Sequence, residues 1–335
     1  MKKTALGLSI ALALGLLTVA WASGERPGAR TVAASPADAL NYLPASDAVM
    51  LIDVRRLLNE TMPQILAGDK EKLAQANSEI DKFKTRTGID PRSFDRVVLG
   101  VRYTYPTANT TKLETVAVAH GKFDAKALAA AARIAANGKY REEKYLGATI
   151  MVININDQMK VLGLWNMQVS ELAICALDAN TLAIGNLPTV RAAIEAGKRG
   201  RANGELIGLA SRDPKAVIGF GANLPRALLA NLNVGNDTIA KDVNSIRQAY
   251  GSIGTTDTDV SLSLIARTDN AEAAKNLNDT VTGLKQLGAI LIVRMAPARK
   301  ALAQSALDNL KITTRGNELE IRTQVAAANL ASVIK

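Results

Sequence analysis

The run Ala48-Val49-Met50-Leu51-Ile52-Asp53-Val54 is the stretch of sequence that decides the fold. It is continuously apolar up to Asp53 and short, which predicts a buried strand. A similar run, Lys215-Ala216-Val217-Ile218-Gly219-Phe220, occurs again in the second half of the chain. Segments patterned as helices and then as strands follow each run. We therefore expect an α+β fold in which one order of elements occurs twice.

The residues that follow the first run predict two helices and then a pair of strands. Helices are expected over residues 55–66 and 69–87, and in the second of these apolar residues recur at spacings of three and four. Residues 95–103 and 113–120 predict paired strands. Asp124 is placed to cap an alanine-rich helix. Four further strands and a helix complete the predicted elements, over residues 145–155, 161–165, 171–177, 181–185 and 188–196.

The segments that follow the second run predict the same order of elements. We expect helices over residues 224–232 and 238–250, and a strand over residues 260–267. This repetition predicts an internal duplication, with related halves at residues 39–203 and 204–335. Each half is expected to pack a mixed or antiparallel sheet against alanine-rich helices.

Two segments differ between the halves and are candidates for binding. Residues 139–170 have no counterpart in the second half, and are either a sheet extension that buries its apolar side chains or a binding edge. Residues 270–295 predict a long helix with a heptad-like apolar stripe. That stripe ends in a continuously apolar run, residues 289–293, which is either buried between the halves or faces a lipid or a partner. The candidate ligand- or partner-binding residues are Tyr145, Met151, Trp165, Met167 and Leu291.

The first 22 residues have the order of a secretory signal peptide. Lys2 and Lys3 precede an apolar run, and Ala20-Trp21-Ala22 provides a cleavage motif. Residues 23–38 are small, polar and proline-containing, and are interpreted as a flexible linker. We expect export to a bacterial periplasm or the medium, with no integral membrane segment after cleavage. The alternative is an uncleaved N-terminal anchor.

The net charge and the aromatic content of the chain indicate which kinds of partner it can bind. The net charge of +10 favours weak attraction to anionic surfaces. Aromatic residues make up only 4% of the chain, which disfavours a specific nucleic-acid site built on base stacking. Cys175 is the one cysteine, so no internal disulfide is expected. We interpret it as a small buried side chain on a strand.

The sequence offers few groups for catalysis. His120 is the single histidine, so a His- or Cys-based zinc site is not expected. No phosphate-binding or dinucleotide-binding glycine motif is present, and no cofactor or metal is expected. A hydrolase that uses paired carboxylates remains an alternative. The aspartates that it would draw on, all at predicted element ends, are Asp53, Asp95, Asp124 and Asp178.

Three short segments resemble uncharacterised exported bacterial proteins that contain a domain of unknown function. The segments are Leu43 to Val54, Gly121-Lys122-Phe123-Asp124 and Leu182-Ala183-Ile184-Gly185. The resemblance implies an export-linked α+β fold and carries no functional residues with it. We expect a non-catalytic envelope protein that binds an envelope protein, an anionic surface or an apolar ligand. A periplasmic carrier of a lipid or other apolar ligand is the alternative.

Overall fold

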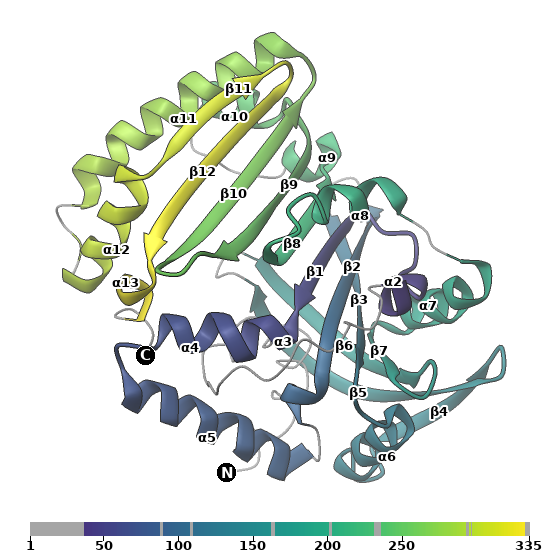
Figure 1. Cartoon of the computed structure of the whole chain (residues 1–335). Coiled ribbons are helices and arrows are strands. Elements are labelled where there is room, and N and C mark those ends of the chain that lie inside the picture. The colour runs from purple at the N-terminus through teal and green to yellow at the C-terminus, as the bar shows by residue number, and fades with distance from the viewer. Residues whose placement is uncertain are drawn as a thin grey trace.

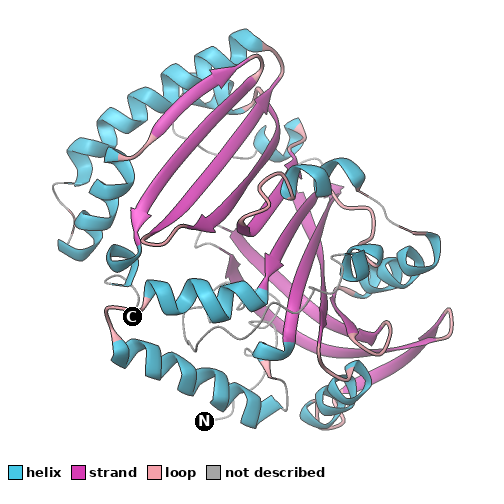
Figure 2. Cartoon of the chain, viewed as in Figure 1, coloured by secondary structure: helices cyan, strands magenta, loops and turns pink. Residues whose placement is uncertain are grey.

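The computed structural model describes residues 37–87, 90–107, 110–161, 165–200, 203–230, 236–292, 295 and 297–331. The predicted signal peptide and nearly all of the predicted linker lie outside these residues. Within them, helices and strands together form an α+β fold, as the sequence predicts (Figure 2).

Twelve strands of the described residues form one antiparallel sheet in the order β11-β12-β10-β9-β8-β1-β2-β3-β7-β6-β5-β4. The strands are β1 (Ala48–Asp53), β2 (Phe94–Thr107), β3 (Thr110–Gly121), β4 (Tyr140–Tyr145), β5 (Ala148–Val161), β6 (Trp165–Ala176), β7 (Thr181–Gly185), β8 (Ala216–Asn223), β9 (Ile246–Thr255), β10 (Asp259–Thr268), β11 (Lys311–Arg315) and β12 (Glu318–Ala326). The two predicted halves therefore share a single sheet instead of having one each.

The pairing of β1 with β8 joins the two halves of the sheet. These strands run antiparallel, with Ala48 opposite Ala222 and Ile52 opposite Ile218. Outward from this pair the order is β1-β2-β3-β7-β6 on one side and β8-β9-β10-β12-β11 on the other. The succession of strands is thus the same in both directions, with β4 and β5 added beyond β6. Descent of the halves from one duplicated ancestor stays a prediction.

Helices lie on both faces of the sheet (Figure 1). They are α2 (Ala37–Asn41), α3 (Val54–Arg56), the π-helix η1 (Leu57–Thr61), α4 (Met62–Ile65), α5 (Lys70–Thr87), the short 3₁₀ turn η2 (Pro91–Ser93), α6 (Ala125–Ala135), α7 (Leu187–Arg199), α8 (Gly204–Ala210), α9 (Arg226–Ala230), α10 (Asp237–Val243), α11 (Ala271–Ile292), α12 (Pro297–Asp308) and α13 (Ala327–Ala331). The helix capped by Asp124 begins as predicted, since the Asp124 carboxylate accepts from the backbone N–H groups of Lys126 and Ala127.

One predicted helix is wrong over part of its length. The helix expected over residues 238–250 ends at Val243, and residues from Ile246 onward form β9. The strands β8 and β10 pair with β9 on both sides and satisfy its backbone groups. Of the separate strand expected over residues 161–165, Val161 belongs to β5 and Trp165 to β6, and residues 162–164 lie outside the described residues.

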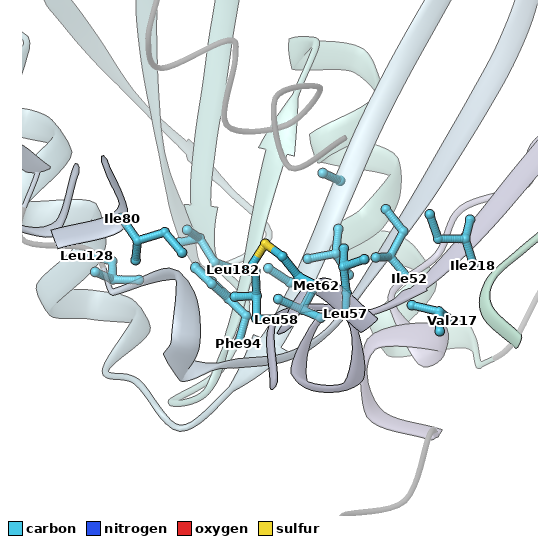
Figure 3. Packing of buried hydrophobic residues seen from close by; sticks show 14 of the residues in the cluster. Ile52, Leu57, Leu58, Met62, Ile80, Phe94, Leu128, Leu182, Val217 and Ile218 are labelled. Carbon is cyan, nitrogen blue, oxygen red and sulfur yellow. The ribbon is translucent and has the colours of Figure 1, made fainter. Parts of the chain in front are cut away.

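The core consists of two large apolar clusters on opposite faces of the sheet. One lies under α3, η1, α4, α5 and α6, with Met62 near its middle (Figure 3). It includes Ile52 and Phe94 of the first half and Val217 and Ile218 of the second, so it extends across the β1–β8 junction. The other lies under α2, α7 and α8. Burial of this apolar surface is the main force that holds the two halves together.

The long predicted helix exists as α11, but it does not lie between the halves. It packs along β11 and β12 at the far end of the sheet (Figure 1). Leu277 of α11, Ala266 of β10 and Leu319 of β12 form a third, smaller cluster there. The interpretation that the apolar end of this stripe is buried between the halves is therefore wrong. The alternative, an apolar face directed at a lipid or a partner, remains open.

Candidate binding surface

The structure places two of the five sequence-predicted binding residues on opposite faces of the sheet. Met151 is 2% exposed and belongs to the cluster around Met62. Tyr145, at the end of β4, packs against the cluster on the other face. These two side chains therefore do not line one site. The side chains of Trp165, Met167 and Leu291 lie outside the part of the chain that the structure describes.

Tyr145 takes part in a polar network that fastens α7 to the edge strand β4. Its hydroxyl group hydrogen-bonds the Glu195 carboxylate, and this bond raises the pKa of Tyr145. The Arg191 guanidinium lies 5.6 Å from the centre of the Tyr145 ring. Arg191 also donates two bonds of 2.6 Å to Glu143, and these lower the pKa of Glu143. Since the Tyr145 hydroxyl and the Glu143 carboxylate both have partners within the chain, we assign this network a structural role.

Half of the exposed large apolar side chains among the described residues lie together in one short segment. The eight such side chains are Tyr105, Ile134, Leu146, Leu262, Leu284, Leu287, Ile290 and Met295. The last four belong to the second half of α11 and the residues just after it, and their exposed fractions are 45%, 57%, 68% and 45%. We call these four residues the α11 surface. Exposed apolar side chains scattered singly need no explanation, whereas a cluster indicates an interaction site.

The geometry of α11 explains why this cluster faces away from the protein. Val281 packs toward the sheet in the cluster around Leu277. Successive helical residues are about 100° apart, so Leu287 and Ile290 lie about 120° and 180° around the helix from Val281. The sheet strands, α10 and α12 contact α11, but Leu287 and Ile290 remain 57% and 68% exposed. The outer side of α11 is consequently uncovered in the described part of the chain.

The charged residues along the chain from the α11 surface into α12 all have the same sign. Between Asp279 and Asp308 the sequence contains no acidic residue and four basic residues, namely Lys285, Arg294, Arg299 and Lys300. Arg299 and Lys300 are exposed in the first turn of α12. Neither forms an ion pair with any other described residue. The Lys285 ammonium donates to the Leu310 carbonyl oxygen over 2.8 Å, so this cation is held at the end of α12.

The single cysteine and the single histidine both have surroundings that suit a structural role. Cys175 is fully buried, and burial raises the pKa of its thiol to about 11. The ring nitrogen Nδ1 of His120 lies 3.0 Å from the hydroxyl oxygen of Thr181, which is itself buried. A thiolate nucleophile at Cys175 is therefore disfavoured at neutral pH.

The four aspartates considered for a hydrolase each have a local partner. Asp53 accepts from the Arg56 N–H over 2.9 Å, and Asp178 accepts from the Asn180 N–H over 2.8 Å. Asp124 caps α6 as described above, and Asp95 lies 3.6 Å from the Arg55 guanidinium. Three of them thus act as caps or turn formers, and the fourth forms an ion pair. Among the described residues, no group of three or more His, Cys, Asp or Glu side chains is arranged to hold a metal ion.

A second polar cluster, which sequence reasoning missed, lies on the sheet of the second half. Tyr250 is fully buried, with the guanidinium carbons of Arg212 and Arg267 at 5.4 and 5.6 Å from its ring centre. Arg212 donates to the Tyr250 hydroxyl over 2.6 Å, and Arg267 donates to Glu318 over 3.0 Å. Burial opposes ionisation of Glu318, but hydrogen bonds from Tyr250 and Arg267 outweigh it and lower its pKa. The residues of this cluster are 17 to 106 positions apart in sequence, so no local pattern marks it.

A hollow of about 840 Å³ lies beside α5 and is open to solvent. The residues that line it all belong to this one helix, and most of them are polar: Ala74, Asn77, Ser78, Glu79, Asp81, Lys82 and Thr85. Such a surface lacks the apolar enclosure of a small-molecule site.

Comparison with known proteins leaves the family of this chain open. The sequence matches no protein-family model and no curated protein. Among solved structures, crystal form III of TP0453 is 12% identical with a TM-score of 0.44, and the match covers 90% of this chain and 98% of that chain. Crystal form IV of TP0453 is 11% identical with a TM-score of 0.44, with coverage of 89% and 96%. No helix of the described residues has both the length and the apolar character needed to cross a bilayer.

Proposed function

We propose that this protein is a non-catalytic binding protein of the cell envelope and that the α11 surface is where it contacts its partner. The observation that carries the proposal is the concentration of Leu284, Leu287, Ile290 and Met295 on one exposed stretch. The export signal predicted over residues 1–22 supports an envelope location. Clusters of exposed apolar side chains are typical of surfaces that other molecules cover.

The strength of such a contact follows from the exposed area. Complete burial of a Leu, Ile or Met side chain stabilises by about 1.5–3 kcal/mol. These four side chains are roughly half exposed, so covering them would contribute about 1 kcal/mol each. The sum, about 4 kcal/mol, corresponds to millimolar affinity. The apolar contact alone therefore gives weak, reversible attachment, and a second contribution is needed for stable binding.

Two alternative functions receive less support from the geometry. A carrier of an apolar ligand needs an enclosed apolar cavity of roughly 300–1,000 Å³, whereas the hollow beside α5 is open to solvent and lined by residues of a single helix. A carboxylate-dependent hydrolase needs two carboxylates about 5–9.5 Å apart that converge on a substrate. The candidate aspartates are instead engaged by backbone N–H groups or by Arg55.

Cell fractionation of charge-substituted variants tests the proposal. The full chain is produced in a bacterial host, and the envelope and soluble fractions are separated. The variant Leu287→Glu/Ile290→Glu introduces two carboxylates on the α11 surface. Ile134→Glu is the matched control, because Ile134 is 80% exposed but lies on α6, in the other half. Intact-mass measurement identifies the processed form, from which the predicted signal peptide has been removed. Only this form is compared, because an uncleaved leader could itself hold the chain in the membrane.

We expect wild type and Ile134→Glu to sediment with the envelope and the double variant to shift to the soluble fraction. All three proteins should melt at similar temperatures, since the substituted side chains are exposed. Processed wild type in the soluble fraction, or a double variant that sediments like wild type, would contradict the proposal.

A further inference from the structure

We infer that the partner of the α11 surface is an anionic lipid surface, on which α11 lies flat while Arg299 and Lys300 contact the headgroups. This inference rests on the proposed function and names the chemistry of the partner. It combines the apolar exposure of α11 with the positive charge that follows it in the chain.

The charge pattern distinguishes a lipid surface from an ordinary protein contact. Every charged residue between positions 280 and 307 is basic. Arg299 and Lys300 are exposed and have no ion pair among the described residues, so their charges are available to an external anion. An apolar helix face combined with unpaired basic side chains is the arrangement that binds the interface of anionic bilayers. The outer face of the first half of α11 is different, since it carries Glu272, Lys275 and Asp279.

The way in which α11 is anchored determines how it meets the bilayer. Ala274, Leu277 and Ile292 are each less than 5% exposed and face the protein. The helix therefore offers only its outer side, and its apolar part extends from Leu284 through Ile290, a rise of about 9 Å. A one-sided apolar segment of this kind lies in the plane of the interface instead of crossing the membrane.

A second copy of the chain fits this surface less well. In a two-fold symmetric pair the same patch occurs on both partners. Both sides of such a contact would then carry an excess of basic residues, because every charged residue between positions 280 and 307 is basic, and this shared positive charge opposes association. An anionic lipid surface instead satisfies these cations and covers the apolar side chains at the same time.

Vesicle flotation of the purified, processed protein tests the inference. Vesicles of phosphatidylglycerol with phosphatidylethanolamine are compared with vesicles of phosphatidylcholine, which carry no net charge. Three proteins are compared with wild type. Arg299→Gln/Lys300→Gln removes the proposed headgroup contacts, and Leu287→Glu/Ile290→Glu removes the apolar contact. Lys122→Gln/Lys126→Gln removes the same charge from exposed positions in the other half.

We expect wild type to bind the anionic vesicles and to leave them as the salt concentration rises to 0.5 M, because counterions screen the headgroups. Each basic residue near an anionic surface contributes about 1 kcal/mol, or about fivefold in affinity. The Arg299→Gln/Lys300→Gln variant should consequently bind about 25-fold more weakly. The Lys122→Gln/Lys126→Gln variant should bind within about threefold of wild type, and Leu287→Glu/Ile290→Glu should not bind.

Three outcomes would overturn the inference. They are equal binding to the two kinds of vesicle, an equal loss of affinity in Arg299→Gln/Lys300→Gln and Lys122→Gln/Lys126→Gln, and no binding to vesicles at all. In the last case, cell fractionation separates the two proposals. Retention in the envelope that still depends on Leu287 and Ile290 would mean that the partner is a protein, and the proposed function would stand. Loss of that dependence would remove both.

Discussion

Replacement of Gly219 by alanine should destabilise the fold strongly, because α8 packs directly on the backbone of β8 at this position. A Cβ atom at Gly219 would lie 1.8 Å from the carbonyl oxygen of Ala210, the last residue of α8. Non-bonded heavy atoms are favourably placed at roughly 3.5 Å. The helix would therefore have to move away from the sheet by about 1.5 Å.

The magnitude follows from what this movement disrupts. Leu206 and Ile207 of α8 are 4% and 7% exposed, and both belong to the cluster under α2, α7 and α8. Loss of about half of the burial of these two side chains costs about 2 kcal/mol. Strain from an overfilled site adds about 2 kcal/mol. We expect Gly219→Ala to lower the free energy of unfolding by about 4 kcal/mol in total.

Gly208→Ala is the matched control, because Gly208 lies in α8 itself and nothing is within 4 Å of its added Cβ. Alanine is the better helix former, so this variant should be more stable than wild type by about 0.5–1 kcal/mol. Urea denaturation followed by far-UV circular dichroism measures both changes. A Gly219→Ala protein within about 0.5 kcal/mol of wild type would refute the close packing of α8 on β8.

Three further predictions concern a core methionine, a partly buried carboxylate and a buried thiol. Met151→Ala should lower the free energy of unfolding by about 2–4 kcal/mol in the same urea assay, because Met151 is 2% exposed; a change below about 1 kcal/mol would contradict its place in the core. The lowered pKa of Glu318 means that its carboxylate stabilises the fold at neutral pH and that this contribution is lost as the pH falls through that pKa. The stability difference between wild type and Glu318→Gln should thus be largest near pH 7 and shrink below about pH 4, and a difference independent of pH would contradict the network. Cys175 should resist thiol reagents at pH 8 in the native state, since burial raises the pKa of its thiol to about 11. It should react fully in urea, where unfolding removes that burial, and rapid labelling of the native protein would contradict the burial of Cys175.

The sequence predicted elements well where the pattern was local. The apolar run at β1 and the cap at Asp124 both involve residues within a few positions of one another. The α+β class follows from these local patterns. Residues 238–250 show the limit of such reasoning, because the strand β9 depends on partners that lie on β8 and β10. Helical spacing in the sequence could not reveal those partners.

The candidate site depended even more on tertiary structure. The apolar stripe of residues 270–295 was recognisable, but its spacing is the same whether neighbours cover it or not. The structure buries Leu277 under the sheet and leaves Leu287 and Ile290 exposed. The predicted residue Met151 shows the opposite case, since the sequence marked it as a binding residue and the fold encloses it.

The sequence by itself determined the composition of the strands and helices, the excess of positive charge and the scarcity of catalytic groups, because these depend on residue types and short spacings. Only the tertiary structure decided that the halves share one sheet through β1 and β8, and which side of α11 remains uncovered. The physical reason is that burial and strand pairing are relations between segments far apart in the chain. The local pattern around a residue does not show whether another segment of the chain covers it.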